Sequence, residues 1–346
     1  MAGSEASAYL FVHFTGDEGS DRDEQIYFAL SQDGQEWRDL RAQGDPVLSW
    51  QGGEGGVRDP FVACGPDGIF HIIATDLSIY HRGGWSEGKA SVNGSTGLVI
   101  WDSPDLVEWS QPRMVDVASS IPGAGMAWAP EACWDGDRQQ WIVFWATRAQ
   151  RREPGNPLAN ELGDDTNMYY ALSPDLRTFS EPVKWIDRSS SVIDTTMLQT
   201  ADGWWYRASK DSEITLERTR NPYAASYEVT RTSDPNQWSY LGTLTDILGN
   251  GRYSSHYLEG PELFVYNAAD AALPDGRPMP FGLMCDQYAE ARGYLAFRCA
   301  DLASHDPKDW ALAGDINFGQ LKKRHGSILP ITQAQYEALN RSFSRN

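Results

Sequence analysis

The 346-residue sequence lacks several features that define large classes of protein. No apolar run approaches the ~20 residues that cross a bilayer. Residues 1–10 contain neither the basic nor the apolar segment of a secretion signal. The four cysteines are scattered, without a Cys-x-x-Cys pair, so we expect reduced, mostly buried thiols. These absences predict a cytoplasmic protein with no membrane partner.

Positive charge is also scarce. The chain has 29 Lys and Arg against 48 Asp and Glu, a formal net charge of −19. Proteins that bind nucleic acid neutralise phosphates with clustered Lys and Arg, so we expect no nucleic-acid partner. A polyanionic substrate is disfavoured for the same reason, whereas a neutral substrate is compatible with the charge.

Motifs for several kinds of chemistry are missing as well. Apart from His325, discussed below, the histidines have no metal-ligand spacing among them. The sequence contains no nucleophile elbow of a serine hydrolase. The glycine-rich segment 52–56 is not followed by the Lys-Ser/Thr pair and helix of a phosphate-binding loop. We therefore expect a protein that requires no cofactor.

Short runs of β-forming residues, separated by turn residues, fill most of the chain. They lie at 9–14, 25–30, 69–74, 97–101, 141–145, 168–172 and 294–298. A helical period is present only weakly, near 333–339. This pattern predicts an all-β protein.

A turn motif that ends in an aromatic residue recurs five times along the chain. It runs from Ser31 to Trp37, Ser103 to Trp109, Ser173 to Phe179, Ser233 to Trp238 and His305 to Trp310. Five copies at a near-constant interval predict a five-bladed β-propeller, formed by residues 1–346 as a single domain. The chain begins with what resembles a second strand and ends, at 325–331, with an unpartnered leading strand. We therefore expect the C-terminal strand to complete the N-terminal blade and close the ring.

Each repeat opens with a polar motif on its expected innermost strand, at 57–62, 127–131, 192–197, 258–262 and 324–328. Alignment on the strand starts makes Asp59, Trp128, Asp194, Glu259 and His325 equivalent, at intervals of 69, 66, 65 and 66 residues. The innermost strands of a propeller surround its axis, so these side chains should converge at one mouth of the central channel. Three carboxylates gathered there cost stability, which indicates a chemical role.

Glycoside hydrolysis uses such a set of carboxyl groups. One group is held protonated and protonates the leaving oxygen, and an ionised group activates water or attacks the anomeric carbon. A third carboxylate can orient the acid and adjust its pKa. The residues alone leave open which carboxylate performs which task.

The ordered motifs Arg58-Asp-Pro60, Trp128-Ala-Pro-Glu131, Ile193-Asp194 and Glu259-Gly-Pro261 resemble glycoside hydrolase family 43 over nearly the whole chain. The resemblance implies an inverting enzyme that acts on arabinose- or xylose-containing polysaccharides. It implies that Asp59 is the general base, Glu259 the general acid and Asp194 the modulator of the acid's pKa. It also implies a place near His325 for a structural Ca²⁺ or a water cluster, although a hydrogen-bonded axial histidine is the favoured role.

Three residues complete the predicted site as candidates for substrate binding: Trp128, His325 and Glu131. Trp128 is either a sugar platform or part of the core. Glu131 and Glu262 follow the ring positions by three residues, and an odd offset along a strand points them away from the axis. A structural role is therefore the favoured alternative for Glu131.

We predict an enzyme that removes terminal α-L-arabinofuranosyl residues from arabinoxylan- or arabinan-type oligosaccharides with inversion. Its partner would be a neutral pentose-containing oligosaccharide. A β-D-xylosidase of the same fold is the nearest alternative, and a non-catalytic carbohydrate-binding propeller is an alternative of another class. The inserted loops 78–95 and 148–166 are expected to set substrate choice.

Overall fold

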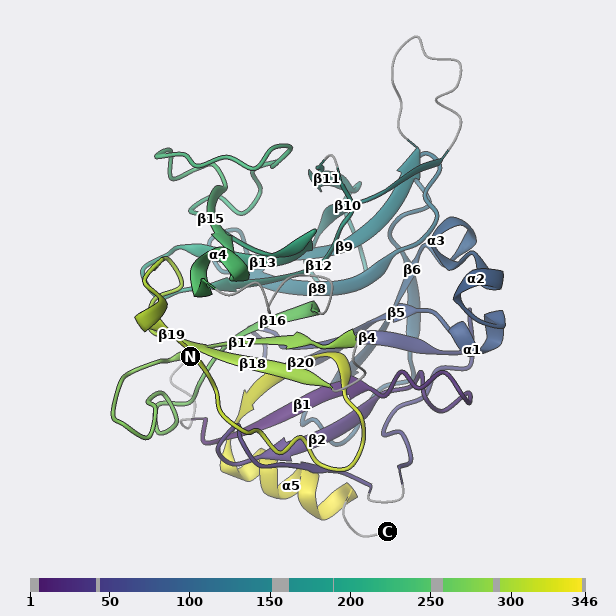
Figure 1. The fold of residues 1–346 in the computed structure, drawn as a ribbon. Coiled ribbons are helices and arrows are strands. Elements are labelled where there is room, and N and C mark those ends of the chain that lie inside the picture. Colours follow the sequence, from purple (N-terminus) through teal and green to yellow (C-terminus); the bar gives the residue numbers. More distant parts are fainter. Residues whose placement is uncertain are drawn as a thin grey trace.

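The computed structural model describes residues 6–41, 44–150, 162–188, 190–249, 258–288 and 293–343. Their strands form five four-stranded antiparallel sheets, which are the five blades of a propeller (Figure 1). From the innermost strand outward, the first blade is β20 (Arg324–Ile331), β1 (Ala8–Phe14), β2 (Tyr27–Ser31) and β3 (Trp37–Asp39). The second is β4 (Val57–Cys64), β5 (Phe70–Asp76), β6 (Gly97–Ser103) and β7 (Arg113–Asp116). The predicted all-β propeller is confirmed.

The other blades repeat this order without a crossover. The third blade is β8 (Trp128–Asp135), β9 (Gln140–Gln150), β10 (Leu162–Ser173) and β11 (Val183–Ile186). The fourth is β12 (Val192–Gln199), β13 (Trp205–Asp211), β14 (Glu213–Thr219) and β15 (Ser239–Thr243). The fifth is β16 (Glu259–Val265), β17 (Phe281–Asp286), β18 (Tyr294–Cys299) and β19 (Trp310–Leu312).

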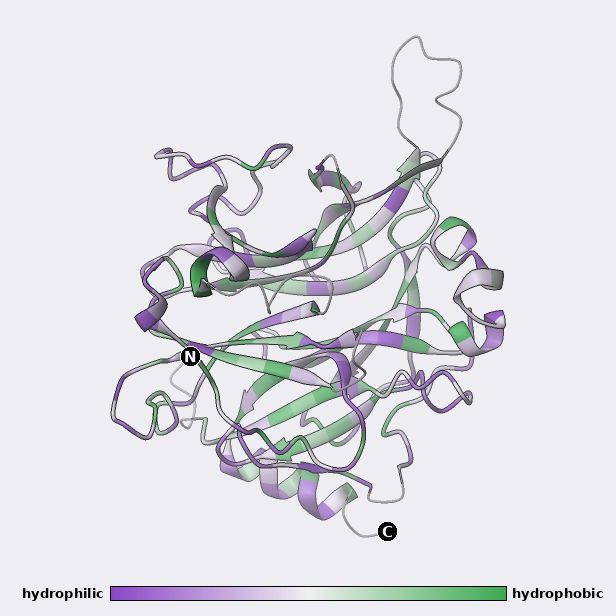
Figure 2. Cartoon of the chain, in the orientation of Figure 1, coloured by the Kyte–Doolittle hydropathy of each residue, from purple (hydrophilic) through white to green (hydrophobic). Residues whose placement is uncertain are grey.

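The first blade closes the ring as predicted. Its innermost strand, β20, comes from the C-terminal part of the chain and pairs antiparallel with β1, with Leu10 opposite Leu329. β1 is apolar except for His13, and green residues predominate along it in Figure 2. The second half of β20, which includes Leu329, is apolar as well. Pairing of β1 with β20 removes the free edge that an open ring would expose.

Hydrophobic side chains fill every interface between neighbouring blades. Phe28 of the first blade packs in one cluster with Ile72 of the second, and Ile73 of the second in another with Val143 of the third. Corresponding clusters join the third blade to the fourth, the fourth to the fifth and the fifth to the first. Because each blade is held on both sides, the inner strands keep a fixed position around the axis.

The recurring turn motif lies between the third and fourth strands of each blade, and its residues explain the repeat. In the second blade the Ser103 hydroxyl accepts a hydrogen bond from the N–H of Leu106 at 2.8 Å. The Asp105 carboxylate accepts from Val107 and Glu108 at 2.9 and 2.8 Å. The third blade repeats these contacts at the motif that begins with Ser173. Short polar side chains thus stabilise the turn by bonding to its backbone.

Helices are few in the described part of the chain. α5 (Gln333–Phe343) follows β20, contains the predicted weak helical period and packs on β1 (Figure 1). The inserted loop 78–95 is largely helical, which its sequence did not indicate, and contains α1 (Ile79–Arg82), α2 (Trp85–Gly88) and α3 (Ala90–Asn93). α4 (Leu244–Leu248) and a 3-10 turn, η3 (Pro307–Asp309), are further helical segments. Much of the other predicted insertion, at 151–161, lies outside the described residues.

Two further expectations concern cysteines and membranes. All four cysteines are free thiols, as predicted. Cys285 and Cys299 are buried, but Cys64 is exposed and Cys133 is partly exposed, so the expectation of mostly buried thiols holds for half of them. Within the described residues, no helix has the length and apolar character needed to span a bilayer.

Candidate active site

The site is built on a β-bulge that recurs in the innermost strand of every blade. In β4, Arg58 lies opposite Thr75 of β5 and Phe61 opposite Ile73, so Asp59 and Pro60 together face a single residue. The extra residue forces a left-handed backbone, with φ of 50° at Asp59. The same two-against-one pairing occurs in β8, β12, β16 and β20. A bulge of this kind redirects side chains, and bulges are frequent at active sites.

The bulge corrects the predicted alignment of the ring residues. Trp128 and Glu259 lie just before the bulge, at the position of Arg58, whereas Asp59 and Asp194 lie inside it. The predicted alignment therefore places Trp128 and Glu259 one position too far along the motif, level with Asp59 instead of Arg58. Because the bulge turns two consecutive side chains toward the same end of the ring, the residues still converge.

One cavity collects these side chains, and its volume is about 370 Å³. Every residue of the predicted ring lines it, namely Asp59, Trp128, Asp194, Glu259 and His325. Four further positively charged or aromatic residues line the same cavity: Arg58, Arg324, Trp85 and Tyr288. The predicted convergence of three carboxylates at one mouth of the ring is therefore present.

Asp59 is surrounded by groups that favour its ionised form. One carboxylate oxygen accepts a hydrogen bond from the Thr75 hydroxyl at 2.9 Å, and the other lies 3.5 Å from Nδ1 of His325. Burial would raise the pKa of Asp59, but the hydrogen bond and charge of His325 and the charge of Arg58 outweigh it and lower the pKa below its usual value. An ionised, hydrogen-bonded carboxylate can accept a proton from water.

Asp194 has the opposite character. It is 7% exposed, and one of its oxygens accepts a hydrogen bond from the N–H of Gly260 at 3.1 Å. Burial, aided by the negative charge of Glu259, raises the pKa of Asp194 to about 6 against the opposing charge of His325. Asp194 therefore both holds the backbone beside Glu259 and can carry a proton in mildly acidic solution.

Glu259 lies between two cations. Nζ of Lys210 is 2.8 Å from one of its oxygens, and a terminal nitrogen of Arg324 is 2.9 Å from the other. Arg324 also pairs with the buried Asp286, which in turn accepts a hydrogen bond from the N–H of His325 at 3.2 Å. These contacts fix the position of the Glu259 carboxyl group.

His325 links the two aspartates. Its Nδ1 lies 3.5 Å from Asp59 and 3.8 Å from Asp194. Burial would lower its pKa, but the charges of Asp194 and Asp59 raise the pKa to about 9. Among the described residues, no three His, Cys, Asp or Glu side chains are grouped so as to hold a metal ion. A Ca²⁺ near His325 stays a prediction of the resemblance.

Glu131 does not lie where a substrate-binding residue should be. It is 4% exposed and is not part of the cavity lining. The prediction that its odd offset points it away from the axis is wrong, because the bulge adds a residue and reverses the alternation. Glu131 instead meets the buried Glu262, and both pKa values are raised, mainly by burial. Ile328 of the next blade donates its N–H to Glu262 at 2.9 Å, so this pair lies within the inner ring of strands.

Sequence reasoning missed several residues that shape the cavity. Lys210 and Arg324 bind Glu259, yet neither was assigned a role. Arg324 directly precedes His325, and its position in that motif could have indicated it. The prolines at 60, 130 and 261 could have revealed the bulge register, since each occupies its second position. Trp85 lies in a loop without any repeat, so no alignment of blades could have found it.

A sequence family related to glycoside hydrolase family 43, and described as a probable glycosyl hydrolase domain, matches residues 4–337. The chain belongs to this family. Its five-bladed fold, with Asp59, Asp194 and Glu259 converging on one cavity, agrees with that membership.

A curated protein of named activity is similar to part of the chain. An α-L-arabinofuranosidase of Bifidobacterium longum subsp. longum is 31% identical to this family member over 223 residues, which cover 58% of the present chain. The match spans 21% of the relative, so the chain corresponds to about a fifth of that protein's length.

Solved structures of similar outline include three glycoside hydrolases. A thermostable family-43 glycoside hydrolase has a TM-score of 0.48 at 16% identity, with 78% of this chain and 74% of that one covered. An exo-β-1,3-galactanase of Clostridium thermocellum has a TM-score of 0.48 at 13% identity, with 78% of this chain and 49% of that one covered. An α-L-arabinofuranosidase of Podospora anserina has a TM-score of 0.46 at 13% identity, with 79% of this chain and 72% of that one covered. Similarity at this level carries no information on substrate.

Proposed function

We propose that this glycoside hydrolase releases terminal α-L-arabinofuranosyl residues from arabinoxylan- or arabinan-type oligosaccharides, with inversion at the anomeric carbon. The observation that carries the proposal is the convergence of Asp59, Asp194 and Glu259 on one cavity. The sugar is inferred from the arabinofuranosidase relative. The net charge of −19 also favours a neutral substrate.

Asp59 acts as the general base in this proposal. Its lowered pKa keeps it ionised, and its oxygens already accept hydrogen bonds from neighbouring groups. Asp59 takes a proton from a water molecule whose oxygen forms the new bond to the anomeric carbon. Inversion requires room for that water, which inverting enzymes provide with carboxyl groups roughly 6.5–9.5 Å apart.

Glu259 delivers the second proton, to the leaving glycosidic oxygen, as that carbon–oxygen bond breaks. Lys210 and Arg324 hold the Glu259 carboxyl group in position, and that group must carry a proton when the bond breaks. Simultaneous ionisation of Asp194 and Glu259 is disfavoured, since the charge of Glu259 raises the pKa of Asp194. We therefore assign the catalytic proton to the Asp194–Glu259 pair, because the ionisation steps of two interacting carboxyl groups belong to the pair and not to either residue.

A panel of para-nitrophenyl glycosides tests the proposal. We expect fastest release from the α-L-arabinofuranoside, slower release from the β-D-xyloside and none from hexosides. Asp59→Asn should lower turnover by ~10²–10⁴-fold with little change in Tm, since a general base contributes about that much. Comparable activity on all glycosides, or Asp59→Asn turnover above about a tenth of wild type, would contradict the proposal.

A further inference from the structure

Trp85 is an exposed aromatic side chain at the edge of the catalytic cavity. It begins α2, within the insertion that joins β5 to β6, and 49% of its surface is exposed. It also lines the cavity together with Asp59 and Trp128. A tryptophan exposed to this extent is unusual in a folded protein, because burial of its ring is favourable. Its exposure at the cavity leaves a flat aromatic face available to a ligand.

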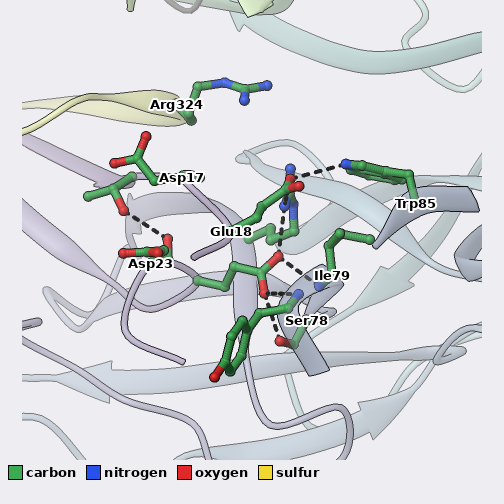
Figure 3. A network of polar contacts seen from close by, with 12 residues as sticks. Asp17, Glu18, Asp23, Ser78, Ile79, Trp85 and Arg324 are labelled. Carbon is green, nitrogen blue, oxygen red and sulfur yellow. Dashed lines mark hydrogen bonds and ion pairs between the residues drawn. The ribbon is translucent and has the colours of Figure 1, made fainter. Parts of the chain in front are cut away.

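Three neighbours hold the Trp85 ring in place. Its indole N–H donates a hydrogen bond to Glu18 at 3.1 Å, as Figure 3 shows. The Arg58 guanidinium lies 5.1 Å from the ring centroid, within cation–π range. The ring of Trp128 meets it nearly edge-on, at 6.0 Å and 81°. Because Glu18 also pairs with Arg58 at 2.9 Å, the indole is fixed to the strand that carries Asp59.

A buried carboxylate fastens the insertion beneath this ring. Glu24 is fully buried and accepts hydrogen bonds from the Ser78 hydroxyl at 2.7 Å and from the N–H groups of Ile79 and Tyr80 at 2.8 and 3.1 Å. It also pairs with Arg58 at 2.8 Å. The start of the insertion and the strand before Asp59 thus share one anchor, so the position of α2 is tied to the catalytic base.

The position of Trp85 relative to Glu259 decides which part of a substrate it meets. Trp85, Arg58 and Asp59 belong to the second blade, whereas Glu259 and Tyr288 belong to the fifth, which is not its neighbour in the ring. The acid must lie next to the leaving oxygen, so the leaving group extends toward the fifth blade. The sugar that is released lies on the side of the base.

We propose that Trp85 is a specificity-determining residue, and that its ring is the wall against which the released terminal sugar packs. Flat aromatic surfaces suit the C–H faces of sugars because they offer apolar area at low entropic cost. Toward Trp85, Glu18 and Arg58 are positioning residues, since each holds the indole. This inference rests on the proposed function for the identity of the sugar.

The test compares binding with turnover in three variants. Trp85→Ala removes the ring, and Trp85→Phe keeps a flat face but loses the N–H. Tyr227→Ala removes a ring that is 57% exposed, slightly more than that of Trp85, and lies outside the lining of the catalytic cavity. Calorimetric titration with free L-arabinose, D-xylose and D-galactose measures binding of the terminal sugar alone. Hydrolysis of an arabino-oligosaccharide gives KM and kcat.

We expect Trp85→Ala to weaken binding of the preferred monosaccharide and to raise KM by the same factor, about tenfold, with kcat changed less than threefold. Trp85→Phe should lose less than threefold, and Tyr227→Ala nothing. Circular dichroism and Tm should match wild type. If KM rises while monosaccharide binding is unchanged, Trp85 contacts the leaving group and the inference is wrong.

Failure of the inference about Trp85 and failure of the proposed function give different experimental results. If wild type binds a monosaccharide through Trp85 but hydrolyses no glycoside, the proposed function is wrong, while the role of Trp85 in packing against the sugar still holds. If wild type hydrolyses the glycoside and Trp85→Ala binds the monosaccharide as tightly as wild type does, only the proposed role of Trp85 is wrong. If wild type binds none of the three sugars, this inference is overturned as well.

Discussion

Asp194 accepts a hydrogen bond from the backbone N–H of Gly260, the residue that follows Glu259, over 3.1 Å. Two neighbouring blades are thereby joined at the position where the third carboxylate meets the strand of the proposed acid. Gly260 permits this contact, because its φ is 49° and an added Cβ would lie 2.7 Å from the ring of His325. The contact gives Asp194 both an electrostatic and a positioning role.

Replacement of Asp194 separates these two roles. Asp194→Asn keeps an oxygen that can accept from Gly260 but removes the ionisable group, so we expect turnover to fall by ~10²-fold with Tm unchanged. Asp194→Ala should lower turnover and also Tm, because an unpaired buried N–H costs ~1–3 kcal/mol. Steady-state kinetics and thermal unfolding measure both. Full turnover in Asp194→Asn would remove this residue from the catalytic set.

The pH profile of kcat/KM should report the carboxyl groups of the free enzyme. Activity requires a proton on the Asp194–Glu259 pair, and the pKa of Asp194 is about 6, so activity should fall as pH rises through about 6. Activity also requires ionised Asp59, whose pKa is below its usual 3.8, so the acidic limb should lie below that value. In Asp194→Asn the alkaline limb should move. An optimum above pH 8 would contradict the assignment.

The buried Glu131–Glu262 pair predicts a pH-dependent stability that is unrelated to catalysis. Burial raises the pKa of Glu262 from 4.5 to about 8. Its contribution to stability is therefore fully present below pH 4.5 and lost as pH rises toward 8. Glu262→Gln keeps an acceptor for Ile328 and cannot ionise, so at pH 8 it should be more stable than wild type, by on the order of 4 kcal/mol.

Denaturant unfolding between pH 4.5 and 8 measures this difference. Glu228→Gln, at an exposed position, is the matched control and should follow wild type throughout. A Glu262→Gln curve parallel to wild type across the range would show that the pair does not carry a raised pKa.

Metal removal should leave the chemistry intact. His325 faces two carboxylates as a cation, and the proposed steps use only protons. We expect enzyme dialysed against a chelator to keep its kcat and KM, measured by pentose release. Loss of activity that only Ca²⁺ restores, at unchanged Tm, would show that a metal takes part.

The sequence alone was enough to predict the blades, because turn chemistry repeats in each one. Ser103 and Ser173 bond to equivalent N–H groups, so selection for one turn leaves a visible period. The closing strand followed from the same count. The convergence of Asp59, Asp194 and Glu259 was predictable too, since innermost strands share one axis.

Other features depend on contacts between segments that no local pattern records. The bulge reverses the alternation of side chains along the strand, so the predicted direction of Glu131 was wrong. Lys210 reaches Glu259 from a different blade, over 49 positions in sequence. The helices around Trp85 are too short to show a period, and they are held by the distant Glu24. These features follow from tertiary structure rather than from propensity.

The anomeric configuration of the first product tests the central claim most directly. Proton NMR during the first minutes of hydrolysis of an α-L-arabinofuranoside, before mutarotation, distinguishes the two anomers. Single displacement by a water that Asp59 activates predicts β-L-arabinofuranose as the first product, and none from Asp59→Asn. First release of the α-anomer, or a covalent glycosyl adduct on Asp59, would make Asp59 a nucleophile and contradict the account.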